Sequence, residues 1–124
     1  STAEALEARA CKALRSGIKR TTWLRVSGPR GSWPALESSD EHGYRYGANR
    51  KTIYAVRADW FDRHLPTDAL RCAGIRLLCR AKQLELAEGR DPERHGFTRG
   101  SYETFLKIQG VNQRFVQFFD FDDD

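Results

Sequence analysis

The sequence predicts a single mixed α+β domain, residues 1–124, with a winged-helix-like order of elements. A helical pattern over residues 67–84 has apolar residues every three or four positions. A pattern of aromatic and β-branched residues over 102–121 is typical of a β-hairpin. The resulting order is helix, strand, short helix, helix and hairpin, with a long loop after the first helix. This order is that of a winged helix, in which the third helix and the hairpin hold the ligand.

The first half of the chain predicts one helix, one long loop and two strand regions. Residues 2–16 form the helix, because acidic residues lie near its start, basic residues near its end, and Gly17 follows. Residues 23–26 are expected as a short strand. Residues 27–43 hold two prolines, three glycines and four serines, a composition typical of a loop. Residues 44–57 predict a turn followed by a strand rich in β-prone residues.

The middle of the chain predicts a helix pair. Residues 58–65 form a short helix that Pro66 closes, and residues 67–84 form the longest helix, capped by Thr67 or Asp68. The longer helix has an apolar stripe and, between two basic flanks, a second apolar seam made of Cys72, Ile75 and Cys79. Such a seam suits a groove lined with phosphates or a partner protein; it is equally consistent with burial under the first helix.

The end of the chain predicts a charged loop, a hairpin and an acidic tail. Residues 85–100 form the loop, and strands over 102–109 and 114–121 are joined by a turn at 110–112. Four of the last five residues, 120–124, are aspartates. They are interpreted as a solvated end or, alternatively, as an acidic and aromatic mimic of nucleic acid that competes for the basic surface.

The charge distribution favours a polyanionic partner. The net charge is +4, and without the four terminal aspartates residues 1–119 carry +8. A body this basic indicates nucleic acid, with duplex DNA as the expected ligand. The predicted contacts are basic side chains of three regions: Arg71, Arg76, Arg80 and Lys82 in the long helix, Arg99, Lys107 and Arg114 around the hairpin, and Arg45, Arg50 and Lys51 near the first strands.

The cysteines indicate a reducing compartment. There are three of them, without a CxxC pair, so free thiols in the cytoplasm are expected and a zinc site is not. No run is long enough for a membrane span, and no cofactor motif is present. The sequence contains no methionine, which is consistent with a domain cut from a longer polypeptide.

A family resemblance supports the same interpretation. The run TIYAVRADWFDRHLP, the Ala/Leu/Arg-rich helix after it, QLELAEG and a basic hairpin together span about residues 44–121. This layout resembles the C-terminal region of primase- and helicase-like ATPases of phages and integrating mobile elements. The resemblance implies a non-catalytic nucleic-acid-binding or docking domain beside an ATPase motor. Because GxxxxGK[ST] is absent, that motor would lie elsewhere in the polypeptide or in another protein.

Two other functions remain open from the sequence. The helix seam and the Phe-rich last strand would suit a protein-interaction or homodimerisation module. A small metal-independent ribonuclease would use His42 or His95 as general base, Arg30 or Arg94 to stabilise the phosphorane, and a tyrosine such as Tyr44. His64, beside aromatic residues of the short helix, is interpreted as structural.

Overall fold

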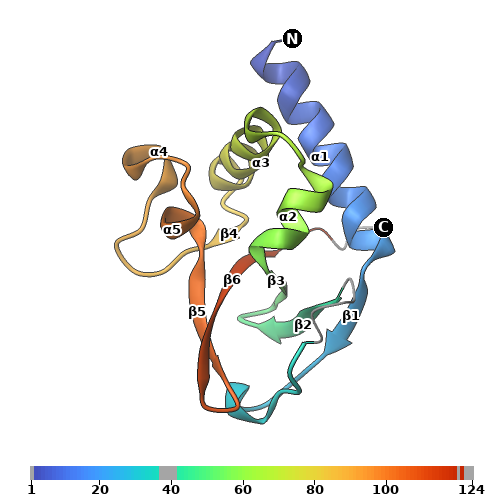
Figure 1. The fold of residues 1–124 in the computed structure, drawn as a ribbon, viewed down its shortest axis with the longest axis vertical. Helices are drawn as coiled ribbons and strands as arrows, with labels where there is room; N and C mark the ends of the chain where they lie inside the picture. The colour runs from blue at the N-terminus through green and yellow to red at the C-terminus, as the bar shows by residue number, and fades with distance from the viewer. Residues whose placement is uncertain (1, 37–41, 120, 122–124) are drawn as a thin grey trace.

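The computed structural model describes residues 2–36, 42–119 and 121, except for the side chains of His95 and Arg99. Three helices, α1 (Ala3–Arg20), α2 (Ala58–His64) and α3 (Asp68–Arg80), lie in the upper part of Figure 1, above a twisted sheet. The domain is therefore mixed α+β, as the sequence predicts. Among the described residues, no helix is both long and apolar enough to cross a membrane.

The sheet has one parallel pair and is otherwise antiparallel. Its order is β1-β2-β3-β6-β4, and β5 also pairs with β6. The strands are β1 (Thr22–Arg25), β2 (His42–Ala48), β3 (Lys51–Val56), β4 (Leu84–Glu85), β5 (Thr104–Ile108) and β6 (Val111–Phe119). Among the strands of the described residues, β1 and β2 are the parallel pair. Strands β4 and β5 pair with successive stretches of β6, and the chain between them forms α4 (Pro92–His95) and α5 (Arg99–Tyr102).

The second half of strand β6, residues 115–119, is buried on both faces of the sheet. Val116 and Phe118 pack in the cluster beneath the helices, whereas Phe115 and Phe119 pack in a second cluster on the opposite face. Over residues 115–119 the strand has no solvent-facing side, and it pairs there with β3 on one edge. The predicted hairpin is present, but its second strand is built into the sheet.

Helices α1 and α3 cross closely because small residues meet at the contact. A Cβ atom at Gly74 would lie 3.0 Å from Leu65 Cδ1 and 3.6 Å from the Cβ of Ala10. Gly17 has a similar role, since a Cβ there would lie 3.0 Å from both Trp60 and His64. The prediction that Gly17 ends the first helix is wrong: Gly17 is buried within α1, which continues to Arg20.

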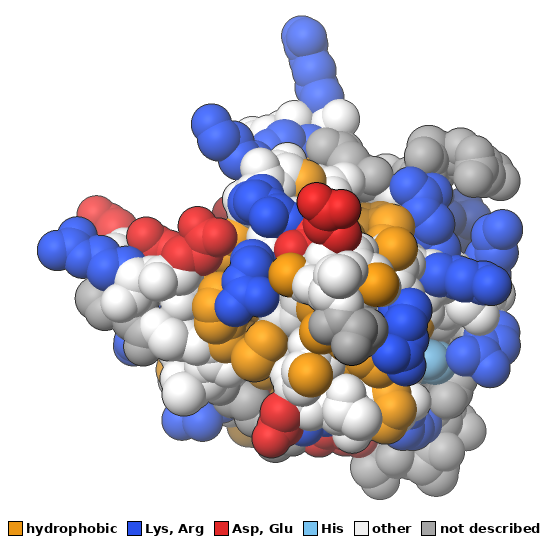
Figure 2. Space-filling model, turned by 90° about the horizontal axis from the view of Figure 1, so that it is seen from above, with side chains coloured by type: hydrophobic (Ala, Val, Ile, Leu, Met, Phe, Trp, Pro, Cys, Tyr) orange, Lys and Arg blue, Asp and Glu red, His pale blue; other side chains and the backbone are white. Residues whose placement is uncertain are grey.

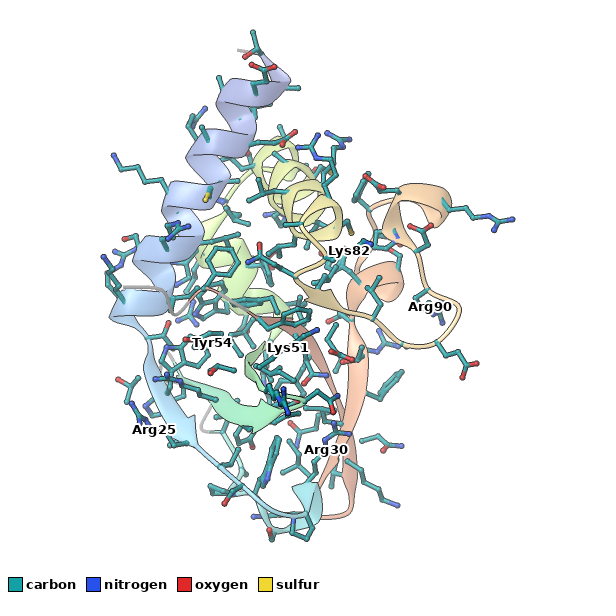
Figure 3. The ribbon with its side chains drawn as sticks, turned by 180° about the vertical axis from the view of Figure 1, so that it is seen from behind. Arg25, Arg30, Lys51, Tyr54, Lys82 and Arg90 are labelled. Carbon is teal, nitrogen blue, oxygen red and sulfur yellow. The ribbon has the colours of Figure 1, made fainter. Side chains whose placement is uncertain are left out.

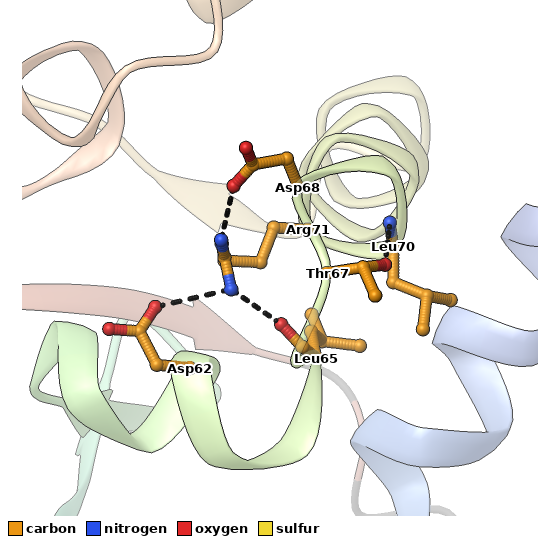
Figure 4. Close-up of polar contacts among 6 residues, drawn as sticks. All are labelled: Asp62, Leu65, Thr67, Asp68, Leu70 and Arg71. Carbon is orange, nitrogen blue, oxygen red and sulfur yellow. Dashed lines mark hydrogen bonds and ion pairs between the residues drawn. The ribbon is translucent and has the colours of Figure 1, made fainter.

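The predicted cap of α3 is confirmed. The Thr67 hydroxyl accepts a hydrogen bond from the Leu70 amide at 3.1 Å (Figure 4). The helix is shorter than predicted and ends at Arg80, because residues 84–85 pair with β6 as strand β4.

Part of the predicted long loop covers the second face of the sheet. It contains the short 3-10 helix η1 (Arg30–Ser32) and then Trp33, which is only 3% exposed. The indole packs against Tyr44 and Tyr46, with ring centres 5.0 and 4.9 Å away. This loop therefore supplies core contacts, which its composition did not indicate; residues 37–41 within it lie outside the described part of the chain.

Candidate nucleic-acid interface

The β5–β6 hairpin has one buried and one exposed face. Along β5, Thr104, Leu106 and Ile108 are buried, while the alternate residues Phe105 and Lys107 are exposed. Register pairs Phe105 with Arg114 of β6, so these two side chains lie on the same side of the hairpin. We call Phe105, Lys107 and Arg114 the outer hairpin face.

An exposed aromatic ring with a cation beside it distinguishes this face. Phe105 is 61% exposed, and the Arg114 guanidinium carbon lies 5.2 Å from its ring centre. The large hydrophobic residues left exposed in the described part of the chain are Phe105 and Val111, and both belong to the hairpin. Burying a bare ring against a nucleobase would be favourable, and the neighbouring cations would meet phosphate.

The hairpin is held in place at its tip. Gln109 and Gly110 form the turn with φ of 51° and 80°, the left-handed values that a tight hairpin requires. The side-chain amide of Gln109 donates a hydrogen bond to the Trp33 carbonyl at 3.0 Å, and this bond connects the hairpin tip to the loop that covers the second face of the sheet. Farther along β6, Arg57 donates to the side-chain oxygen of Gln113. The outer hairpin face is thus presented by a fixed strand pair.

Arg71 stabilises the junction of α2 and α3 rather than facing solvent. Its guanidinium donates to the Leu65 carbonyl at 2.9 Å and forms ion pairs with Asp62, at 3.5 Å, and with Asp68 (Figure 4). A phosphate would have to compete with two carboxylates for this side chain. Its predicted phosphate contact is therefore disfavoured.

The other cations predicted on the long helix have mixed environments. Arg80 forms an ion pair with Glu7 of α1, whose side chain is 12% exposed. Arg76 lies over the ring of Phe97, 4.9 Å from its centre. Lys82, just after α3, is exposed. The structure gives Arg80 a role in joining two helices and leaves Lys82 accessible.

The cations predicted near the first strands are split between the two faces of the sheet. Arg45 lies over Tyr54 on the helix side, at 5.7 Å from the ring centre, whereas Lys51 lies 4.1 Å from the centre of Phe119 on the other side. Arg50 is exposed in the β2–β3 turn. The nine predicted contacts whose side chains the structure describes therefore do not all lie on one face; the side chain of Arg99 is outside the described part.

A second basic surface follows α1 and was not predicted. Seen from above, Lys and Arg side chains gather on the right-hand side of Figure 2, the side on which α1 lies in Figure 1. The exposed cations of this helix include Arg9, Lys12, Lys19 and Arg20. Their spacing could have indicated a basic stripe. No exposed large hydrophobic residue accompanies them in the described part of the helix.

The apolar seam of α3 is largely covered by the chain itself. Ile75 is 1% exposed and belongs to the core. Phe97 and Tyr102 line a hollow of about 330 Å³ together with Cys72 and Ile75, so the segment after α4 packs over the seam. Burial, followed by the charges of Glu93 and Asp91, raises the pKa of the Cys79 thiol to about 11. The prediction that Ile75 docks a partner is therefore wrong, because its side chain is buried in the core. The alternative prediction, burial of the seam under the first helix, is incomplete, because Phe97 and Tyr102 also lie against the seam.

The structure buries one of the residues predicted for the alternative ribonuclease function, so a substrate could not reach it. Tyr44 is 1% exposed, and its hydroxyl donates to the Pro34 carbonyl. His64 is buried with its ring 4.5 Å from that of Trp60, which fits the predicted structural role. Arg30, in contrast, borders a cleft with Tyr46.

The cleft beside Arg30 contains polar residues that the sequence interpretation missed. Its floor includes Gln117 and Thr104, both buried in strands. A signal for Gln117 was present, because it is the one polar residue in the apolar run 115–119. A buried amide in such a run needs partners, which points to a polar network.

The possible metal ligands and the comparisons with known proteins identify no further functional residues among those described. Within the described residues, no group of three or more His, Cys, Asp or Glu side chains is arranged to hold a metal ion. The three cysteines are free thiols. No family model, curated protein or solved structure matches the chain.

Proposed function

We propose that this protein binds nucleic acid through the outer hairpin face, with unpaired bases stacking on Phe105. The observation that carries the proposal is a 61% exposed phenylalanine in cross-strand register with Arg114, beside Lys107. Stacking of one base on an aromatic ring contributes about 1–3 kcal/mol and does not depend on which base it is. The cations supply the phosphate contacts, which depend on salt.

This proposal shifts the contact surface from the long helix to the hairpin. In a winged-helix mode, α3 would enter the major groove of duplex DNA and the hairpin would hold the backbone. That mode would take Arg71 and Arg80 out of ion pairs with Asp62, Asp68 and Glu7, which costs binding energy. We therefore favour a single strand over a duplex. A cytoplasmic role in replication or transfer of a phage or mobile element, beside an ATPase motor, remains part of the proposal.

Fluorescence anisotropy with a labelled single strand, a duplex and an RNA, across a salt series, tests the proposal. The variant Lys107→Ala/Arg114→Ala removes two cations of the outer hairpin face. For a single strand, each lost phosphate contact lowers the salt slope by about 0.7, so the double variant should lose about 1.4.

The variant Lys12→Ala/Lys19→Ala is the matched control, because it removes the same charge from α1. It should leave the slope close to that of the unmodified protein. Equal losses in both double variants would show that net charge alone drives binding and would refute a hairpin interface. Absence of binding to every probe at low salt would refute the function itself.

A further inference from the structure

A cleft lies on the sheet face opposite helices α1, α2 and α3. Its volume is about 400 Å³, within the range of about 300–1,000 Å³ typical of small-molecule sites. Apolar side chains, including Ile53 and Leu106, form part of its wall. The polar residues that line it come from six different segments: Arg30, Tyr46, Asn49, Glu85, Thr104 and Gln117.

The floor of the cleft is a directed chain of hydrogen bonds. The Tyr46 hydroxyl donates to the side-chain oxygen of Gln117, whose amide nitrogen donates to the Thr104 hydroxyl at 3.0 Å. Thr104 in turn donates to the Phe115 carbonyl at 3.4 Å. These three side chains are at most 9% exposed. Because the Tyr46 hydroxyl gives its proton to Gln117, the lone pairs of the Tyr46 oxygen remain for a donor at the cleft.

Arg30 lines the cleft together with Tyr46 and is the cation placed to be that donor. Burial raises the pKa of Tyr46, while the charge of Arg30 and its hydrogen bond to the phenol act in the opposite direction. The Tyr46 phenol therefore stays neutral at pH 7 and lies beside the guanidinium of Arg30, a residue that is otherwise exposed. The remaining donors of that planar group match the oxygens of a phosphate. Figure 3 shows Arg30 and Lys51 in the sheet part of the molecule. Lys51 is a second cation near the cleft in sequence, because Asn49 and Ile53, two residues to either side of it, line the cleft.

Glu85 places a negative charge in the same cleft as the positive charge of Arg30, which limits the kinds of ligand that the cleft can bind. A carboxylate in the same cleft repels a bare anion, but it accepts hydrogen bonds from sugar hydroxyls or from a base amino group. A nucleotide has both an anionic end and such donors, and its base would lie against Ile53 and Leu106. We propose that this cleft binds a nucleoside monophosphate, with its phosphate on Arg30 and its sugar or base donors on Glu85.

This binding goes beyond the hairpin function and is tested separately from it. Amide chemical shifts of the full chain would be followed by NMR during titration with AMP, CMP, GMP or UMP, and with inorganic phosphate. At least one nucleotide should give saturable shifts at Thr104 and Leu106. Arg30→Ala should weaken this binding by at least about tenfold, the effect of losing one charge-assisted contact. Arg25→Ala, an exposed arginine on the edge strand β1, is the matched control and should leave the affinity unchanged.

Glu85→Ala separates a nucleotide site from a simple anion site. It should weaken the nucleotide and strengthen inorganic phosphate, because the repulsion disappears together with the acceptor. The proposal is overturned if no nucleotide shifts these amides at millimolar concentration, or if inorganic phosphate binds the unmodified protein as tightly as the nucleotides do. Lys107→Ala should weaken oligonucleotide binding and preserve monophosphate binding; loss of monophosphate binding in that variant would also overturn the cleft assignment.

Discussion

Replacement of Gly43 by alanine provides a quantitative test of the packing between the edge of the sheet and α1. A Cβ atom at this position would lie 2.4 Å from Cζ3 of Trp23 and 2.9 Å from the Ala55 carbonyl oxygen. Both distances are shorter than van der Waals contact, so the indole or strand β3 must move. The indole is not free to do so, because its N–H donates to the Ile18 carbonyl at 3.0 Å and its ring packs on Tyr54 at 4.7 Å.

The expected loss follows from three contributions. Overpacking costs about 1–3 kcal/mol, and a weakened indole hydrogen bond costs about 1 kcal/mol. The lower backbone entropy of an unfolded alanine returns about 0.4–1 kcal/mol. The free energy of unfolding should therefore fall by about 1–3.6 kcal/mol. For a domain of this size that corresponds to a Tm lower by about 4–14 °C.

Gly47→Ala is the matched control in the same strand. Its added Cβ would meet nothing closer than the Lys51 carbonyl oxygen at 3.9 Å. The control should be neutral or gain up to about 1 kcal/mol. Urea denaturation followed by tryptophan fluorescence measures both variants. Equal midpoints for Gly43→Ala and Gly47→Ala would refute the packing of Trp23 over Gly43.

Three further predictions concern stability and thiol reactivity. Arg50→Gly should raise the urea midpoint slightly, because removing the cost of a native φ of 64°, about 1–2 kcal/mol, exceeds the backbone entropy of about 0.4–1 kcal/mol that glycine adds to the unfolded chain; a lower midpoint would contradict that turn. Arg80→Ala should lower the free energy of unfolding by about 1 kcal/mol, and adding Glu7→Gln should recover part of the loss; additive losses would contradict the ion pair. Iodoacetamide should label Cys79 of the native protein slowly at pH 8, and stability should fall as pH rises from 9 to 11, because the unfolded thiol loses its proton first; rapid labelling would contradict its burial.

Local signals in the sequence predicted the local structure well. Thr67 before an apolar periodic run is enough to start a helix, because the cap and the stripe are both encoded within a few residues. The hairpin was equally predictable from alternating apolar residues around Gly110. The turn itself begins one residue earlier than predicted, at Gln109, because Ile108 pairs with Val111.

Long-range pairing was not predictable in the same way. The aromatic run 115–119 predicts a strand, but its central place depends on partners in β3 and β4 that the pattern does not specify. The sequence likewise shows Arg80 as a cation, and only the crossing of α1 and α3 reveals that Glu7 pairs with it. Local composition indicated a loop around Trp33, although the indole fills a core position.

The most direct measurement is the affinity of a labelled single strand for the unmodified protein, Phe105→Ala and Val111→Ala at one low salt concentration. Both variants shorten an exposed hydrophobic side chain of the same hairpin, Phe105 at 61% exposure and Val111 at 57%. Loss of one stacked base, about 1–3 kcal/mol, predicts roughly 5- to 150-fold weaker binding for Phe105→Ala. Val111→Ala should bind like the unmodified protein. Equal affinities of the two variants, or no binding by the unmodified protein, would contradict base stacking on the outer hairpin face.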